Sequence, residues 1–479
     1  MDGAHKPPLA SYVVCAIGFF GLFVTRWLTN QYVFPSYVSA FAAGALPSHA
    51  LKDIAVGASA ILLAAVAVAS MWRQSWFAGP RLPYLSLGCL VAGAAATIAA
   101  QLGAPLPIYI VAAILVDVGC SVTCVMVCVG AMTFGTRGAC VCVAIATVVA
   151  FTVRPVLMGF DTLVGFLVFV LVGIGTAGLS VASSAHTMED VRGQDSPAEL
   201  AVTHPTSFLP FGHKLYVSLF AFEVAYGFAI TVGSFIESSS WSPFVLGALV
   251  LVAVLLVAPI PGIKADWLLI LCILCVLAGI LSFSVPGQTA QVLGKDAFSA
   301  GSNLFQALAF FALVSIGSRN KLGGLTVAAW GSAAMYLGVI VGANMGRLAE
   351  GWFLDAGTVS AATSVAALVY VAVMLVILYG FSIQSTISSV EDVHVSVGVA
   401  SDKPDLDEIC ARLADERGLT GREAEVLVLL AKGRNSPYIQ EALGVSYNTA
   451  RTHVRHIYEK CDFHTQQELI DEIERRSKS

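Results

Sequence analysis

The sequence predicts an all-α protein: a polytopic transmembrane bundle of about 12 helical spans (6+6), followed by a C-terminal four-helix domain with a helix-turn-helix. Hydrophobic residues make up 57% of the chain and charged residues only 12%, whereas soluble proteins are roughly 45–50% apolar and about 25% charged. Residues 1–390 contain 14 basic and 14 acidic side chains, and residues 391–479 contain 12 and 17, which together give the 26 and 31 of the whole chain. This uneven distribution indicates two regions in two solvents.

Apolar segments long enough to cross a bilayer, about 20 residues each, follow one another from residue 9. The first apolar run continues past Phe23 and lacks the small-residue cleavage site of a signal peptide, so we expect it to be the first span. The predicted spans, which form a transmembrane sensor-like domain over residues 1–382, are 9–30, 53–71, 84–102, 106–133, 139–158, 162–182, 214–236, 243–261, 267–285, 298–317, 323–345 and 358–381.

Basic residues between the spans predict the orientation. With a cytoplasmic N-terminus, nine Lys and Arg side chains fall at cytoplasmic positions and five at outer positions, as the positive-inside rule requires. An even number of spans returns the C-terminus to the same side. We therefore expect a multi-pass protein of the plasma membrane with both termini in the cytoplasm, where DNA is.

Six plus six spans around a polar stretch at 183–213 resemble the major facilitator architecture of two pseudo-equivalent halves. The resemblance covers residues 9–381 and rests on topology. Those transporters usually carry a Gly-Asp-Arg-Gly-Arg-Arg type of loop after the second span. The corresponding residues 71–81 keep Arg73, Gly79 and Arg81 but lack the acidic partner, which weighs against active transport and not against the fold.

Four ionisable residues fall inside predicted spans: Arg26, Asp117, Arg154 and Glu223. A charged group in the bilayer costs several kcal/mol unless it is paired or hydrated, so each is a functional candidate. Spans one, four and seven line the central cavity in the family that the bundle resembles. One interpretation is that the four residues border a polar cavity that holds a small molecule. The alternative is an internal ion pair, such as Arg26 with Asp117, that only fixes helix packing.

Cysteines and glycines form weaker patterns. Cys120, Cys124 and Cys128 share one helical face, as a soft-metal or redox sensor requires, but packing explains the stripe equally well and no His joins it. We therefore predict no metal site and no cofactor. Gly342 and Gly346 have the spacing that permits close helix approach.

Composition changes after Phe381. Residues 383–409 are rich in Ser, Thr and acids and are expected to form a linker, with helix beginning near Leu406. Residues 410–479 are expected to form a separate domain.

The C-terminal domain has clear helix signals. Thr420 and Glu423 form a capping box that opens a helix over 422–432, which Gly433 ends. Ser436 and Pro437 begin a short second helix. A Gly-Val-Ser turn at 444–446 then leads to a third helix over 447–461.

The faces of the third helix carry different residues. Ala450, Val454, Ile457 and Cys461 have core spacing, while Arg451, Thr452 and Arg455 lie on another face. Arg434, His453, His456 and Lys460 flank that face. A short helix, a tight turn and a longer basic helix are the helix-turn-helix layout, whose second helix enters the major groove.

The motifs Leu419-Thr420-x-Arg422-Glu423, Leu443-Gly444-Val445-Ser446, Thr452-His453-Val454 and Ile457-Tyr458-x-Lys460 closely resemble the LuxR/FixJ/GerE family of DNA-binding domains. This resemblance implies four helices, of which the third reads the major groove and the fourth mediates dimer contact. It implies that Arg451, Thr452 and Arg455 face the bases, while Thr449 and Lys460 contact the backbone or support the domain. The family pattern departs at Ala450, Cys461 and Gln466.

These features predict a membrane-bound one-component transcription regulator that binds double-stranded DNA as a homodimer and responds to an unidentified small molecule in its membrane domain. No receiver domain or nucleotide-binding loop is evident, and we expect no enzymatic activity. Two alternatives stay open: a transporter with a regulatory DNA-binding tail, and a tail that docks proteins. Residues 391–479 have a net charge of −5, from 12 basic and 17 acidic residues. This charge favours the alternative of a protein-docking tail, because nucleic-acid-binding domains are usually basic.

Overall fold

The computed structural model describes most of the chain. The described residues are 9–40, 49–77, 79–190, 197–198, 207–232, 265–282, 285, 287–352, 356–379, 381–390, 406–431, 439–440, 443, 446–463 and 466–477. Every regular element in these ranges is helical, as predicted. The chain divides into two compact units, Met1–His394 and Val395–Ser479.

The first unit is built from long apolar helices. Ten helical segments in the described ranges are long and apolar enough to cross a membrane. Their helices are α1 (Leu9–Leu28, continued by the π-helical turn η1, Thr29–Val33, and by α2, Phe34–Ala40), α3 (Ala50–Trp72), α4 (Arg81–Gln101), α5 (Leu106–Ala131), α6 (Gly135–Met158), α7 (Thr162–Asp190), α9 (Lys214–Val232), α11 (Ala265–Ser282), α12 (Gln288–Arg319) and α13 (Lys321–Trp352).

Two predicted spans need separate comment. The span at 243–261 lies outside the described residues. The last predicted span, 358–381, corresponds to α14 (Ala356–Leu378), whose apolar segment Ser364–Ile377 is shorter than the ten others. Twelve spans therefore stay a prediction.

Several helices extend beyond their predicted ends. The span expected at 298–317 is part of α12, which begins at Gln288 and includes Lys295 and the buried Asp296. Hydropathy ends a predicted span at the first charges, whereas the helix continues because its backbone hydrogen bonds do not require apolar side chains.

The first span continues past its predicted end at residue 30 through the π-helical turn η1 to Tyr37. Polar side chains at the turn bond to the helix itself: the Thr29 hydroxyl donates to the Thr25 carbonyl at 2.7 Å, and the Asn30 amide donates to the Arg26 carbonyl at 2.9 Å. Internal bonding of this kind lets polar residues remain in a transmembrane helix. π-turns are rare and often lie at functional sites.

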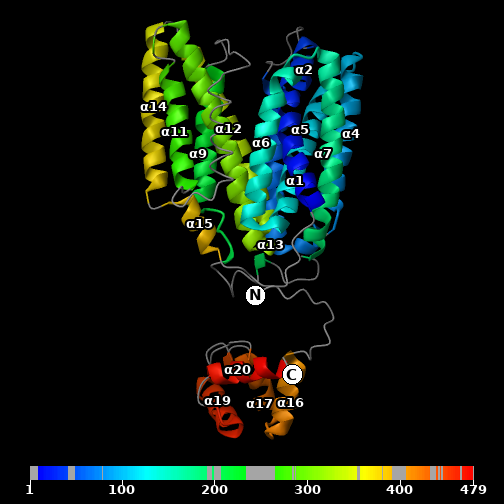
Figure 1. The fold of residues 1–479 in the computed structure, drawn as a ribbon, viewed down its shortest axis with the longest axis vertical. Coiled ribbons are helices and arrows are strands. Elements are labelled where there is room, and N and C mark those ends of the chain that lie inside the picture. The colour runs from blue at the N-terminus through cyan, green and yellow to red at the C-terminus, as the bar shows by residue number, and fades with distance from the viewer. Residues whose placement is uncertain are drawn as a thin grey trace. The chain divides into compact units, whose positions relative to one another are not determined.

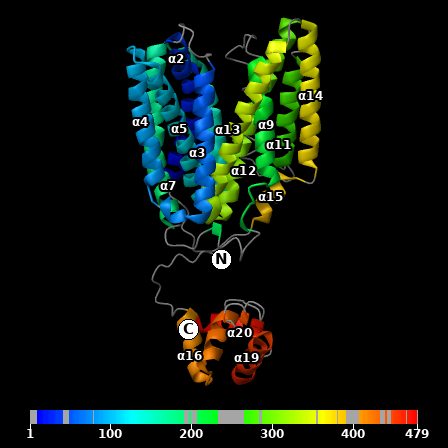
Figure 2. The ribbon, with the colours of Figure 1, turned by 180° about the vertical axis from the view of Figure 1, so that it is seen from behind.

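The membrane unit consists of two helical bundles. Helices α1 to α7 form one half and α9 to α14 the other (Figure 1), and the opposite view shows α3 and α13 where the halves meet (Figure 2). Helix α13 packs against α9 of its own half and also against α3 and α5 of the other half. One apolar core, which includes Phe19, Met126, Phe305 and Leu313, joins both halves.

Glycines allow α13 to lie against α9. A side-chain carbon at Gly342 would overlap the carbonyl oxygen of Val224, and one at Gly346 would lie 2.9 Å from Cβ of Thr231. The close helix approach predicted for this glycine pair is therefore present.

Polar contacts also connect the halves through α3 and α13. The hydroxyls of Ser70 and Thr326 lie 2.8 Å apart near one end of the helix pair. An ion pair joins Asp53 of α3 to Arg347 of α13 toward the other end. The two helices are thus tied near both ends.

Part of the predicted linker 383–409 belongs to the membrane unit, which corrects its expected start. Residues Ile383–Ser389 form helix α15, whose Ile383 and Ile387 are buried in the large core. Asp266 of α11 holds its start, because its carboxylate accepts hydrogen bonds of 2.7 Å from the Ser382 hydroxyl and from the Ile383 amide. The serines and threonines in this segment suggest a linker by composition. In the structure they cap α15 and form hydrogen bonds with its backbone.

The second unit contains helices α16 (Leu406–Glu416), α17 (Gly421–Ala431), α19 (Tyr447–Cys461) and α20 (Gln466–Ser477). Most of the predicted second helix lies outside the described residues, but Ile439 is described and fully buried. The unit has its own core, formed by Leu413, Val426, Leu427, Ile439, Ala450, Ile457 and Leu469 among others. The second unit therefore has a hydrophobic core that contains no residue of the membrane unit.

Candidate functional site

Helix α19 begins at a side-chain cap. The Ser446 hydroxyl accepts a hydrogen bond of 3.1 Å from the Thr449 amide and lies 2.7 Å from the Thr449 hydroxyl. Such a cap satisfies amides that have no partner within the helix. Thr449 therefore supports the start of α19.

One face of α19 is buried and another is exposed, as its spacing indicates. Ala450, Ile457 and Cys461 are buried and Val454 is half-buried. Arg451, Thr452 and Arg455 are exposed. The burial of Ala450 and Cys461 fixes the rotation of the helix, so the three polar side chains point away from the core.

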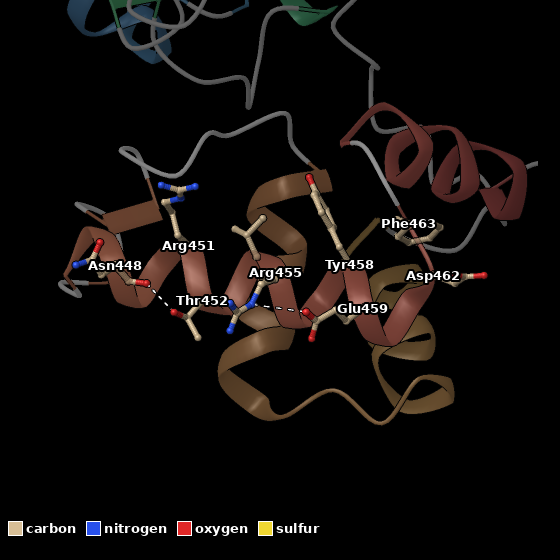
Figure 3. Close-up of a pocket in the computed structure, with 9 residues that line it drawn as sticks. Asn448, Arg451, Thr452, Arg455, Tyr458, Glu459, Asp462 and Phe463 are labelled. Atoms are coloured by element: carbon tan, nitrogen blue, oxygen red, sulfur yellow. Dashed lines mark hydrogen bonds and ion pairs between the residues drawn. The ribbon is translucent and has the colours of Figure 1, made fainter.

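The exposed face borders a shallow depression of about 670 Å³. Figure 3 shows its lining residues along α19, with a hydrogen bond of 2.9 Å from the Thr452 hydroxyl to the Asn448 carbonyl. The lining residues are Asn448, Arg451, Thr452, Val454, Arg455, Tyr458, Glu459, Asp462 and Phe463. Asn448 and Tyr458 are absent from the predicted site, although their spacing from Arg451 and Arg455 places them on the same helical face.

Charge changes sign along this face. Arg451 lies in the first half of α19 and Arg455 near its middle, while Glu459 lies near its end and Asp462 directly after it, and all four are exposed. Arg455 Nε lies 3.6 Å from the Glu459 carboxylate, and an exposed pair of this kind contributes little to stability. The N-terminal part of α19 is therefore the part whose charge suits a polyanion.

Lys460 lies in a supporting arrangement. Its ammonium is 2.7 Å from Oε2 of Glu423 and 3.2 Å from the Gly418 carbonyl oxygen. Glu423 also accepts a 2.7 Å hydrogen bond from the Thr420 amide, which completes the predicted capping box. Burial raises the pKa of the Glu423 carboxyl, but the hydrogen bonds from Lys460 and Thr420 outweigh it and lower that pKa to about 2.

The flanking residues differ in what they contact. His456 Nδ1 lies 3.6 Å from the Glu423 carboxylate, on the side of α19 that faces α17. His453 is half-buried, and Arg434 lies outside the described residues.

The four predicted membrane residues come from four helices: Arg26 from α1, Asp117 from α5, Arg154 from α6 and Glu223 from α9. Asp117 and Glu223 are buried, while both arginines are partly exposed. Arg26 interacts electrostatically with both carboxylates. Asp117 accepts a 2.5 Å hydrogen bond from Ser59, and no direct salt bridge joins it to Arg26, although the structure describes both.

Aromatic residues that the sequence patterns do not single out surround these charges. The Arg154 guanidinium lies 5.1 Å from the ring centre of Trp27 and 5.8 Å from that of Phe151, and the Arg26 guanidinium lies 5.9 Å from that of Tyr336. Tyr226 interacts electrostatically with both arginines. Its place three residues after Glu223, on the same face of α9, is the signal that could have identified it.

The cysteines of α5 form no metal site with other described residues. Cys120, Cys124 and Cys128 are free thiols. No group of three or more His, Cys, Asp or Glu side chains suited to a metal ion occurs in the part of the chain that the structure describes.

Taken together, the two units define a polytopic helical membrane protein that carries a helix-turn-helix domain. Residues 417–473 match the family described as bacterial regulatory proteins, luxR family, so the C-terminal unit contains a LuxR-type helix-turn-helix. The uncharacterized response regulatory protein YgeK of Escherichia coli (strain K12) is 38% identical over 66 residues, which are 14% of this chain. The match spans 45% of the length of that relative.

Solved structures show that the first unit has the major facilitator fold. The human organic anion transporter TETRAN and the Escherichia coli fucose:proton symporter FucP each have a TM-score of 0.51 and 12% identity. Each match covers 78% of this chain and 100% or 99% of the other chain, respectively. The proton:xylose symporter XylE has a TM-score of 0.52 and 11% identity, covering 80% of this chain and 98% of its own. At such identities the likeness concerns the fold alone.

Proposed function

We propose that this protein is a membrane-bound transcription regulator whose C-terminal unit binds double-stranded DNA in a sequence-specific manner through α19. The observation that carries the proposal is the exposed face of Arg451, Thr452 and Arg455 at the start of a helix whose opposite face is buried in a LuxR-type domain. Arginine can form two hydrogen bonds to guanine in the major groove. Asn448, on the same face, has the amide that suits adenine.

The remaining predicted contacts have supporting roles in this proposal. Thr449 caps α19, and Lys460 fixes α19 to α17 through Glu423. His453 and Arg434 are the phosphate contacts in this proposal, as the sequence pattern predicts. Two copies bind together through α20, as the family resemblance implies.

The membrane unit is the sensor in this proposal. A small molecule binds among Arg26, Asp117, Arg154 and Glu223, between the two halves, and shifts the unit between two states. A ligand can cause such a shift only if it binds the two states with different affinity. Helix α13, which packs on both halves, is the element through which their relative position would change. The protein lies in the plasma membrane with both termini in the cytoplasm, which gives the C-terminal unit access to DNA.

DNA binding is tested with residues 395–479, which have a separate core, and with the full chain in lipid nanodiscs. Selection from a random DNA library should enrich a defined sequence, and its affinity should fall steeply with salt because phosphate contacts release counterions. Arg451→Ala should relax the enriched sequence at one position, because one base contact is lost. Arg422→Ala, an exposed arginine on α17 paired with Glu425, is the matched control. Absence of salt-dependent binding at low ionic strength would instead support a protein-docking tail.

The second candidate is a transporter whose tail regulates its own gene. The major facilitator fold and the buried Asp117 and Glu223 favour it, while the lack of an acid in the loop after α3 weighs against it. Saturable, gradient-driven uptake in proteoliposomes that is lost in Asp117→Asn or Glu223→Gln would support transport. Uptake equal to that of empty liposomes would exclude it for the compound tested.

A further inference from the structure

The two arginines of the membrane cluster, Arg26 and Arg154, differ in whether a carboxylate lies near them. Both carboxylates of the cluster, Asp117 and Glu223, interact with Arg26, and Asp117 also interacts with Lys52 of α3. Arg154 has no hydrogen bond or ion pair with any other described residue, and among the described residues the titratable neighbour that acts on it is Tyr226, whose phenol is uncharged. Arginine is always protonated in proteins. Arg154 is therefore the arginine of this cluster that no described carboxylate neutralises.

The surroundings of Arg154 are flat and apolar. Its guanidinium lies over the rings of Trp27 and Phe151, which meet edge to face with ring centres 4.6 Å apart. Neither Trp27 nor Phe151 has a side-chain hydrogen-bond acceptor atom, so these contacts supply no acceptor to the N–H groups of the guanidinium. The edge of a guanidinium can hold a carboxylate with two parallel hydrogen bonds.

Side chains from both halves of the membrane unit lie around Arg154. Trp27 and Arg154 come from α1 and α6, whereas Tyr226 and Tyr336 come from α9 and α13, and all four side chains are only partly buried. The π-helical turn η1 begins two residues after Trp27 and locally alters the course of the first span. A molecule bound here would contact both halves, as a ligand that changes their relative position must.

We propose that the membrane unit binds a small organic anion with an aromatic body, whose carboxylate is held by Arg154 and whose ring lies against Trp27 and Tyr226. The inference rests on the proposed function in one respect, namely that this site is the sensor. An anion is favoured over an amine because the two carboxylates, Asp117 and Glu223, already have Arg26 and Lys52 as cationic neighbours, which leaves the charge of Arg154 in excess. An uncharged ligand would leave Arg154 uncompensated in a medium where an unpaired charge is costly.

Binding is tested on the purified full chain in nanodiscs with benzoate, 3-phenylpropionate and 2-naphthoate, each beside its amide and the corresponding primary amine. Tryptophan fluorescence and calorimetry report binding. The best carboxylate should bind at least about tenfold more tightly than its amide, since a hydrogen bond to a charged group contributes about 1.5–3 kcal/mol. Tighter binding of the amine, equal binding of acid and amide, or no binding of any acid at millimolar concentration would overturn the proposal.

Two substitutions test whether Arg154 binds the carboxylate of the ligand. Arg154→Gln should remove the preference for acid over amide, and Arg154→Lys should retain part of it, because a positive charge remains. Arg81→Gln, an exposed arginine at the start of α4, is the control and should change nothing. A preference that survives in Arg154→Gln would overturn the assignment. Where Arg154→Gln yields too little folded protein, the reduced preference of Arg154→Lys decides.

A separate readout distinguishes this inference from the proposed function. A reporter gene under the DNA sequence selected with residues 395–479 is measured in cells with and without the best acid. Acid binding without a change in the reporter would contradict the sensor role and leave the ligand class standing. A reporter that responds while no acid binds the purified chain would contradict the ligand class and leave regulation standing.

Discussion

Lys460 joins the end of α19 to the start of α17, because its ammonium lies 2.7 Å from Oε2 of Glu423. The Glu423 side chain is only 5% exposed and also closes the capping box with Thr420. Removal of the cation from such a pair leaves a buried charge without compensation, which costs more than the pair itself contributes. The orientation of α19 therefore depends on a charge contact in addition to the core.

Lys460→Met should destabilise the C-terminal unit without changing the exposed face of α19. We expect the free energy of unfolding of residues 395–479 to fall by about 1.5–3 kcal/mol, the range for hydrogen bonds to charged groups. Urea denaturation measures it. Arg422→Met, which breaks the exposed pair with Glu425, should cost less than about 0.5 kcal/mol. Equal effects of the two substitutions would refute this role of Lys460.

The same contact predicts how stability depends on pH. The pKa of Glu423 is about 2 in the folded unit against an ordinary value of 4.5. A lowered carboxyl pKa stabilises the fold above the ordinary value, and this contribution is lost as the pH falls from about 5 to about 2. Urea midpoints measured at pH 7, 5, 4 and 3 should decline across that window. Glu423→Gln should show a flatter decline, and an unchanged slope would contradict the prediction.

Arg451→Ala should relax the choice of base at one position of the DNA site. Loss of a two-hydrogen-bond contact to guanine reduces discrimination by about 1–3 kcal/mol. Competition between the selected sequence and its single-base variants measures the effect, with Arg417→Ala as a control that alters an exposed arginine before α17. If affinity fell equally for all sequences, Arg451 would be a phosphate contact instead.

Gly342→Ala should separate α13 from α9. The added carbon would overlap the backbone oxygen of Val224, which cannot move away as a flexible side chain could. Overpacking of this kind typically costs about 1–3 kcal/mol. We expect less monodisperse protein after solubilisation and a lower melting temperature in detergent. Gly175→Ala in α7, where no other atom lies within 4 Å, should behave like the unaltered protein.

Local sequence patterns, such as helical spacing and capping residues, predict the features of individual helices well. The core spacing of Ala450, Ile457 and Cys461 identifies the buried face of α19, and the capping box predicts a helix from residue 422, one residue after the observed start of α17 at Gly421. The glycine pair in α13 similarly predicts a close helix contact, for which the structure supplies the partner, α9. These features depend on local geometry, which the spacing of residues contains directly.

Features that depend on distant partners are not predictable in this way. The π-turn in the first span, the packing of α15 on Asp266 and the aromatic surroundings of Arg154 all require knowledge of which helices are neighbours. The sequence identifies the charged residues in the spans, because they are rare there, but not Trp27 or Tyr226, because aromatic residues are common in apolar helices. Arg154 illustrates the difference. The sequence shows that it lies in a span, but only the structure shows that no described carboxylate pairs with it.

The change of sign along α19 has a consequence for the operator. On the exposed face, Arg451 and Arg455 would favour the groove, whereas Glu459 and Asp462 would repel phosphates, and the nearby Lys460 is engaged with Glu423. A face of this kind cannot be reversed on the duplex without placing its acids where the arginines would otherwise lie. Each domain would thus read its half-site in a single direction, and two copies related by a two-fold axis would require an inverted repeat.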